Sequence, residues 1–371
     1  MRLMCIMNQN IFNVKSGGGQ CALRNYESIK AIVEDNDELY TCVISPEIKH
    51  MLNNEKELYI PGLVGNVQSA LAALWGCKCY KKKYEKVIWQ FIDQVKPDVI
   101  YIDTSKLGKL SKRIKKKYKT RIICFFHNVE SDYSMNLVKK RGFQYLLSYW
   151  TSLYNEKMAL KYGDTFACLT QRDSARINEL YRRRVDTIIP ISLKDRFDAS
   201  RVAIDERNDL LFVGSLFPPN YDGVKWFVEN VMTELPDKIL TIVGKDFERK
   251  RGELERENVK VIGTVENTDE FYYTYPYMVM PIPYGAGMKV KTAEAMMFGK
   301  IIFATDEALE GYSIESVEGI YRCNTADEFI YNIRLFTQKD QKYMSDRIRE
   351  VFLSNYEFEV TKEQFKKILK A

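Results

Sequence analysis

The sequence predicts an α/β protein with two doubly wound domains in tandem. Short apolar runs alternate with stretches of helical periodicity along the whole chain, which is typical of parallel sheets covered by helices on both faces. The 371 residues are enough for two domains of ordinary size. A polar stretch without periodicity, residues 198–208, separates two series of such runs, and we interpret it as a linker.

The first series predicts a domain over residues 1–200. A glycine-rich turn follows the first run, and the stretch from Gln20 to Glu34 has the periodicity of a helix. The expected strands are LMCIM, LYTCVIS, PDVIYID, TRIICFFHN, TFACLT and TIIPI. Because these runs are largely apolar rather than alternating, we expect strands that are buried on both faces.

The second series predicts a domain over residues 201–345. Its expected strands are DLLFVGSL, ILTIVGKD, VKVIGTV, MVMPIPY and KIIFAT. Helical stretches between them cover Val224–Leu235, Asn267–Thr274 and Lys291–Phe298. Residues 346–371 predict one or two further helices with no strand after them.

Composition favours a reduced, cytoplasmic protein without metal. No apolar run approaches the ~20 residues that a membrane span needs, and the N-terminus lacks the pattern of a signal peptide. Several of the eight cysteines lie inside strand-like runs, as small buried hydrophobic residues do. Cys77 and Cys79 are the only close pair, and with two histidines in the chain we expect no metal site.

The basic charge is concentrated in the first 200 residues, which have 33 Lys and Arg against 21 Asp and Glu. The runs KCYKKKYEK, KRIKKKYKTR and VKKRGFQYLLSYW carry much of it. Solvated helix faces explain such runs, and so does an anionic membrane surface or an anionic polymer. No recognisable nucleic-acid-binding motif contains them, so nucleic acid is not an expected partner.

Two motifs of the first domain follow expected strands, where doubly wound domains bind ligands. Gly17, Gly18 and Gly19 come between the first strand and the first helix, and they would let the backbone approach an anionic ligand. A flexible surface turn is the alternative. His127 ends the run RIICFF, and we favour a functional histidine over a structural one.

The second domain carries two further motifs. Gly214 and Ser215 end its first strand, and we expect a loop containing Asn220 to follow. The segment from Gly285 to Glu294 combines a glycine bend, two lysines and a carboxylate. A carboxylate can accept two hydroxyl hydrogen bonds from a ribose, and lysines can bind a diphosphate. Solvated lysines beside a helix-terminal glutamate are the alternative.

The run from Leu211 to Tyr312 resembles the donor-binding domain of glycosyltransferase family 4, whose members have the GT-B fold. The matching segments are LLFVGSLFPPNYDGVKWF, LTIVGKD, VKVIGTVEN, YMVMPIPYGAGMKVKTAEAMMFGKIIFAT and ALEGY. The first domain matches more loosely, through GGG and HNVES. The resemblance implies two Rossmann-like domains that face a cleft: an acceptor-side domain over residues 1–200 and a nucleotide-sugar-binding domain over residues 201–345. A C-terminal helix over residues 346–371 would pack back toward the first domain.

The resemblance also implies an activity. A sugar would move from a nucleotide-diphosphate-sugar donor to an acceptor hydroxyl, with retention at the anomeric carbon and without a cofactor. Glu294 would bind the ribose, His127 would lie beside the transferred sugar, and the three glycines from Gly17 would lie near the reacting groups. Lys289 or Lys291 would supply charge to the phosphates, and we favour Lys289 as a catalytic residue. The remaining residues of the expected nucleotide-sugar site are Gly214, Ser215, Asn220, Gly287 and Met288.

One departure from the family keeps other functions open. Many members have an additional glutamate at the position of Ala286. A non-catalytic GT-B subunit that binds a partner transferase, or a GT-B nucleotide-sugar epimerase, therefore remains an alternative. We expect a saccharide or lipid-linked saccharide acceptor from surface polysaccharide or glycolipid biosynthesis, and a cytoplasmic protein with the inner membrane face as a second location.

Overall fold

The computed structural model describes residues 1–14, 17–64, 66–77, 79–201, 209–315, 317–337 and 344–370. These residues form two compact units: Met1–Ile191 with Glu359–Ala371, and Ser192–Phe358. The chain leaves the first unit at Ile191, earlier than the expected boundary at residue 200. Residues 202–208 of the expected linker lie outside the described residues.

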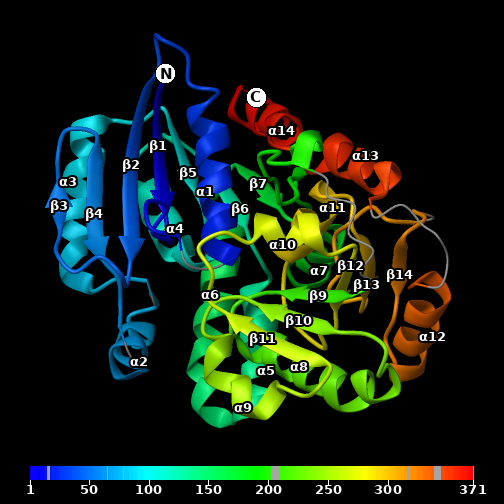
Figure 1. The fold of residues 1–371 in the computed structure, drawn as a ribbon. Coiled ribbons are helices and arrows are strands. Elements are labelled where there is room, and N and C mark those ends of the chain that lie inside the picture. The colour runs from blue at the N-terminus through cyan, green and yellow to red at the C-terminus, as the bar shows by residue number, and fades with distance from the viewer. Residues whose placement is uncertain are drawn as a thin grey trace. The chain divides into compact units, whose positions relative to one another are not determined.

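The first unit contains an eight-stranded sheet of order β3-β4-β2-β1-β5-β6-β7-β8 (Figure 1). All its pairs are parallel except β3 with β4. The strands are β1 (Arg2–Met7), β2 (Glu38–Ser45), β3 (Leu52–Asn53), β4 (Glu57–Pro61), β5 (Val99–Ile102), β6 (Arg121–Phe126), β7 (Thr165–Cys168) and β8 (Thr187–Ile188). The helices are α1 (Gly17–Lys30), α2 (Asn66–Leu74), α3 (Glu85–Val95), α4 (Gly108–Lys117), α5 (Glu130–Arg141), α6 (Leu146–Tyr162), α7 (Gln171–Tyr181) and α14 (Phe358–Lys370).

Helices cover both faces of this sheet. Phe91 of α3 and Ile114 of α4 share one buried cluster with strand residues such as Ile6. On the opposite face the ring of Phe365, on α14, lies 6.0 Å from Tyr101 and 6.2 Å from Phe125. The C-terminal helix therefore belongs to the first unit, as the expected GT-B fold requires.

The second unit contains a parallel six-stranded sheet of order β11-β10-β9-β12-β13-β14. The strands are β9 (Leu210–Val213), β10 (Leu240–Val243), β11 (Val259–Gly263), β12 (Tyr277–Met280), β13 (Ile301–Ala304) and β14 (Ile320–Arg322). The helices are α8 (Pro218–Asn230), α9 (Arg251–Leu254), α10 (Asp269–Thr274), α11 (Val290–Met297), α12 (Ala326–Thr337) and α13 (Asp346–Asn355). Helix α13 stays with this unit, so the tail from residue 346 divides between the two units.

Two expected loops are helical instead. Gly17 to Gly19 form the first turn of α1 rather than a turn before it. Pro218 and Pro219 open α8, so Asn220 lies in a helix and not in a loop. Proline is tolerated there because the first helical N–H groups have no partner within the helix.

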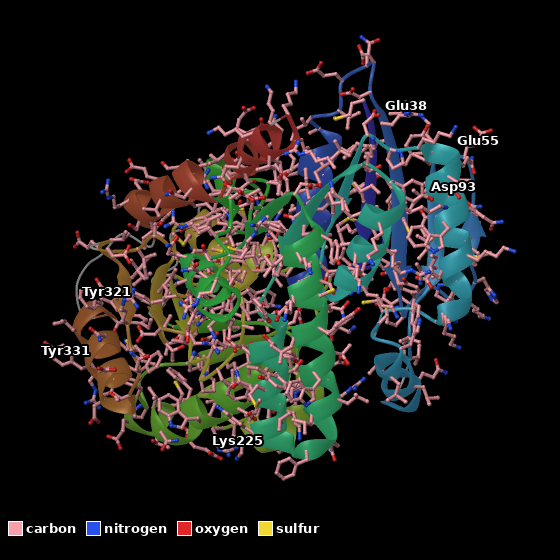
Figure 2. All side chains as sticks on the ribbon, turned by 180° about the vertical axis from the view of Figure 1, so that it is seen from behind. Glu38, Glu55, Asp93, Lys225, Tyr321 and Tyr331 are labelled. Atoms are coloured by element: carbon pink, nitrogen blue, oxygen red, sulfur yellow. The ribbon has the colours of Figure 1, made fainter. Side chains whose placement is uncertain are left out.

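The outer surface of each unit is marked by polar side chains. Seen from behind, Glu55 and Asp93 point outward from the first unit, and Tyr331 points outward from α12 in the second (Figure 2). Tyr331 is 65% exposed.

Candidate functional site

Each sheet has a point at which its strand order reverses. In the first unit β1 lies between β2 and β5, and in the second β9 lies between β10 and β12. In doubly wound folds, ligands bind beyond the carboxyl ends of the strands at such a point. The predicted site residues lie at these two places.

In the second unit, Lys291 connects the ends of β9, α8 and α11. Its Nζ donates to Asn220 Oδ1 at 2.6 Å, and Asn220 Nδ2 donates to the carbonyl oxygen of Ser215 at 2.8 Å. A side chain at Gly214 would bring its Cβ to 2.8 Å from Lys291 Nζ, so glycine keeps this approach open. The structure thus brings Gly214, Ser215, Asn220 and Lys291 together, as one group of the predicted site.

This group has the properties of an anion-binding site. Neither α8 nor α11 has a side-chain cap at its N-terminus, and Lys291 and Asn220 lie in their first turns. Burial, with help from the charge of Lys289, lowers the pKa of Lys291 to about 7. A bound anion would offset that destabilisation of the charged amine.

Lys289 has different surroundings from Lys291. Its Nζ forms an ion pair with Glu307 Oε1 at 2.5 Å and donates to the carbonyl oxygen of Gly287 at 2.7 Å. Gly287 has a φ of 62°, a conformation that favours glycine, and so it lets the chain turn back toward Lys289. The neighbouring Met288 is buried. Lys289 therefore serves the bend itself, whereas Lys291 points to β9 and α8.

Glu294 lies farther along α11, facing Arg196 and Tyr272. Arg196 Nη2 donates to Glu294 Oε1 at 3.4 Å, and the Tyr272 hydroxyl donates to Oε2 at 3.2 Å. Burial raises the pKa of Glu294, although Arg196 opposes this shift. Asp269 holds Arg196 from the other side at 3.2 Å. We did not predict Arg196, because by pattern it lies in a polar stretch next to the linker.

In the first unit, His127 forms an ion pair with a buried carboxylate. His127 Nε2 lies 2.8 Å from Asp103 Oδ2, and Asp103 Oδ1 accepts from Tyr101 at 2.6 Å and from Asn25 at 3.0 Å. Burial opposes protonation of His127, but Asp103 outweighs it, so the pKa of His127 is well above its ordinary value. We did not predict Asp103, although it directly follows β5 and its position at a strand end was a signal that could have identified it.

The three glycines lie at the N-terminus of α1. Gly17 and Gly18 are exposed, and Gly19 is buried. No atom of the described structure lies within 4 Å of the Cβ that a side chain at Gly18 would add. Close packing in this unit therefore does not require a glycine at position 18, and both ligand approach and an exposed surface segment stay open as explanations.

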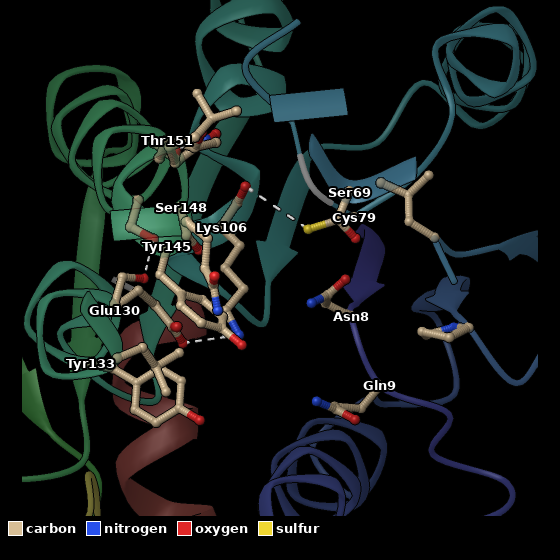
Figure 3. Close-up of a pocket in the computed structure, with 18 residues that line it drawn as sticks. Asn8, Gln9, Ser69, Cys79, Lys106, Glu130, Tyr133, Tyr145, Ser148 and Thr151 are labelled. Atoms are coloured by element: carbon tan, nitrogen blue, oxygen red, sulfur yellow. Dashed lines mark hydrogen bonds and ion pairs between the residues drawn. The ribbon is translucent and has the colours of Figure 1, made fainter. Parts of the chain in front are cut away.

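The first unit also has a cavity of about 840 Å³ beyond the carboxyl ends of its strands (Figure 3). Asn8, Gln9, Lys106, Glu130 and Ser148 are among the residues that line it. The sequence analysis did not identify this cavity, because its residues come from distant segments without a shared motif. The described residues contain no group of three or more His, Cys, Asp or Glu able to hold a metal ion. Within the same residues, no helix combines the length and the apolar character required to span a bilayer.

Comparison with known proteins adds a family match in the second unit. Residues 207–338 match the family model for glycosyl transferases group 1. The whole chain is similar in fold to sucrose-phosphate synthase from Thermosynechococcus elongatus, with a TM-score of 0.74 and 14% identity over 100% of this chain and 98% of that chain. No curated protein matches the chain.

Two other solved structures extend the comparison. HepE from Anabaena, in complex with UDP and glucose, has a TM-score of 0.67 and 12% identity over 99% of both chains. The lipopolysaccharide outer core galactosyltransferase WaaB has a TM-score of 0.67 and 14% identity over 100% of both chains. These likenesses confirm the predicted GT-B fold. Together with the family match, they indicate a glycosyltransferase of the GT-B type.

Proposed function

We propose that this protein transfers a sugar from a UDP-sugar to an acceptor hydroxyl, with retention, in surface polysaccharide or glycolipid biosynthesis. The observation that carries the proposal is the Lys291–Asn220–Ser215 group at the reversal point of the second sheet. Its lysine and its two uncapped helix N-termini suit a diphosphate. UDP is the first nucleotide to test because HepE, a structure of similar fold, holds it.

The proposed chemistry assigns a task to each part of the second unit. When the bond between the anomeric carbon and the diphosphate breaks, negative charge develops on the phosphate oxygens. Lys291 and the N–H groups of the first turn of α11 would stabilise that charge in a site already arranged for it. Glu294, held by Arg196 and Tyr272, would accept the ribose hydroxyls. The sequence favoured Lys289 for the phosphates, but its ion pair with Glu307 leads us to propose Lys291.

Retention follows in this proposal from a displacement on the face that the leaving group occupies. The acceptor oxygen forms its bond to the anomeric carbon as the bond between that carbon and the diphosphate oxygen breaks. The acceptor proton passes to an oxygen of the leaving diphosphate, so no covalent intermediate with the enzyme is needed. His127, as an imidazolium paired with Asp103, would donate a hydrogen bond to the transferred sugar.

The first test is the dependence of UDP binding on Glu294. Glu294→Ala should weaken binding by roughly 1–3 kcal/mol, because the ribose loses a charged acceptor and Arg196 loses a partner. Isothermal titration calorimetry of UDP measures this change, and Glu229→Ala, at an exposed position on α8, is the control. An affinity unchanged in Glu294→Ala would remove the ribose assignment, and no binding of UDP or any other nucleoside diphosphate by the wild type would overturn the proposed donor.

A further inference from the structure

The cavity of the first unit lies where the carboxyl ends of several strands meet. Asn8 and Gln9 follow β1, Lys106 follows β5, and Glu130 begins α5. Ser148 comes from α6 on the other side of the space, and the amides of Asn8 and Gln9 point into it (Figure 3). Its volume of about 840 Å³ is within the range of small-ligand sites.

The charges in this cavity cancel. Among the described residues that line it, only Lys106 and Glu130 are ionised side chains, and they form an ion pair at 3.1 Å. The nearby Glu130 carboxylate raises the pKa of Lys106. A phosphate that approached Lys106 would therefore compete with Glu130 and be repelled by it.

A second anion-binding feature of the cavity is already occupied from within. Helix α5 begins at Glu130 with no side-chain cap from its own N-cap residue, so its first N–H groups face this region. Glu156, buried on α6, accepts from the N–H of Glu130 at 2.6 Å and from that of Ser131 at 3.3 Å. Its other oxygen accepts from Tyr181 at 2.5 Å. The N–H groups of Glu130 and Ser131 thus have a partner within the protein and are not offered to a ligand.

The remaining polar groups suit hydroxyls. The lining includes the amides of Asn8, Gln9 and Gln144, which both donate and accept, and the phenol rings of Tyr133 and Tyr145. Aromatic faces pack against the apolar faces of a sugar ring, while amides bind its hydroxyls in either direction. A fully ionised ligand would lack a matching charge here.

We propose that this cavity binds an uncharged sugar ring of the acceptor, and that the Lys106–Glu130 pair excludes acceptors with a phosphate at that ring. The proposal rests on the proposed function, because it names the acceptor class of the same reaction. It predicts that a single substitution changes the preference. Glu130→Gln leaves Lys106 without its carboxylate, and the variant should gain affinity for phosphorylated sugars.

The experiment measures binding to the full chain in the presence of saturating UDP, so that the donor site is filled. The probes are the methyl glycosides of glucose, galactose and N-acetylglucosamine, and the 6-phosphates of the same sugars. Saturation-transfer NMR should detect at least one glycoside with the wild type and should detect the phosphates at least about tenfold more weakly. Glu130→Gln should raise the affinity for the sugar phosphates by about tenfold, which is the scale of one charged hydrogen bond. Glu55→Gln removes the same charge at an exposed site of the same unit and should change neither.

UDP binding provides the check on folding and separates the two proposals. If UDP binds but no glycoside does, or if the wild type prefers the phosphates, the acceptor inference is overturned and the proposed donor stands. A variant that retains UDP binding but shows no gain for the phosphates overturns the role of the ion pair. If Glu130→Gln fails to fold, Lys106→Met replaces it. This variant should bind the sugar phosphates more weakly than the wild type, because Glu130 would then repel them without a neighbouring cation.

Discussion

Lys291 and Lys289 are two residues apart, yet the contacts of their amines differ. Lys291 donates to an amide, Asn220, whereas Lys289 has Glu307 as an ionic partner. A partly buried amine with a neutral partner gains more from a bound phosphate than an amine that already has an ionic partner. The two lysines should therefore be distinguishable by the pH dependence of nucleotide binding.

We predict that UDP affinity falls by about tenfold per pH unit between pH 7.5 and 9. The pKa of Lys291 is lowered to about 7 in the free protein, and a bound diphosphate should raise it, so binding takes up a proton over this range. UDP itself takes up little proton above pH 7.5, because the second pKa of a phosphate is about 6 and the group is then almost fully ionised. Calorimetry in buffers of different ionisation enthalpy measures the proton uptake directly.

Lys291→Arg is the matched variant, because its guanidinium stays charged over the whole range and the pH dependence should disappear. Lys291→Ala should weaken binding at every pH, and Lys289→Ala should weaken it less. An unchanged pH dependence in Lys291→Arg would show that another group takes up the proton.

The Asp103–His127 pair predicts a second titration at the scale of single residues. Because the pKa of His127 is raised in the folded protein, the pair stabilises the fold fully below the ordinary histidine pKa of about 6.5, and this contribution is lost as the pH rises through the folded value. Asp103→Asn should lower the pKa of His127 below about 6.5, since burial alone disfavours the imidazolium. Asp93→Asn, at an exposed carboxylate, is the control.

NMR titration of the imidazole signals checks this prediction well, because the chain has only two histidines. A His127 signal that titrates at the same pH in wild type and Asp103→Asn would refute the assignment of Asp103 as its partner. The same series should show that the wild type loses more stability than Asp103→Asn between pH 6.5 and the folded pKa of His127.

At the scale of elements, the sequence pattern was sufficient to predict the strands and helices that pack regularly. The parallel strands of both sheets were predicted from apolar runs, because strands buried on both faces have little else. Strands β3, β4 and β14 were missed. β3 and β14 are short edge strands, and β4, which lies between β3 and β2, alternates buried and half-buried residues and so lacks a continuous apolar run. The helical starts at Gly17 and Pro218 were missed because glycine and proline usually mark turns.

The candidate site divides in the same way. Residues at strand ends, such as Gly214 and His127, were predictable because the end of a strand is visible in the sequence. Arg196 and Glu156 were not, because their roles depend on tertiary contacts with residues 98 and 26 positions away. Lys289 and Lys291 were both visible as candidates, but only their partners distinguish them.

Helix α14 makes the element-scale prediction. Phe365 is buried against Tyr101 and Phe125, and Arg121 donates to the carbonyl oxygens of Ile368 and Leu369 at 2.7 and 3.2 Å. Phe365→Ala should destabilise the first unit by about 3–5 kcal/mol, the usual cost of emptying an aromatic position in a core. Lys366→Ala, at an exposed neighbour, should have little effect.

The measurement is urea unfolding with and without UDP, because a ligand of the second unit protects that unit by mass action. Phe365→Ala should shift the transition that UDP does not protect. A variant in which only the UDP-sensitive transition moves would show that α14 stabilises the second unit instead of the first.

At the scale of the whole molecule, the two units have related parallel sheets but carry different side chains at the point where the strand order reverses. Both have a reversal point with functional candidates, but the second holds a partly buried lysine and the first a neutral cavity. This division suits a protein that binds an anionic donor in one unit and an uncharged acceptor in the other. The excess of basic residues in the first 200 residues therefore needs another explanation, since the only basic residue among the described residues that line the cavity, Lys106, is paired with Glu130.

Exposed apolar side chains lie beside some of the basic residues of the first unit. Phe143, Leu147, Trp150, Tyr154 and Met158 follow one another at spacings of three and four, which is typical of one face of a helix. Phe143 is 85% exposed and Trp150 60% exposed, whereas Leu147 of the same series lines the cavity together with Ser148 and Thr151. Lys157, Lys161, Arg182 and Arg183 surround a shallow depression next to Trp150. An apolar helix face beside basic residues is the composition of an interfacial membrane contact.

We predict that the protein sediments with vesicles of anionic phosphatidylglycerol at low salt, leaves them at high salt, and binds neutral phosphatidylcholine vesicles only weakly. Each basic residue near an anionic surface adds about 1 kcal/mol, so replacing Lys157 and Lys161 together by Gln should lower partitioning by at least about tenfold. Trp150→Ala should lower it as well, while Tyr331→Ala, at an exposed aromatic residue of the second unit, should not. Because α6 places this surface on the helix that also lines the cavity, such binding would bring a lipid-linked acceptor to the site. No sedimentation with anionic vesicles at low salt would instead favour an acceptor that is free in solution.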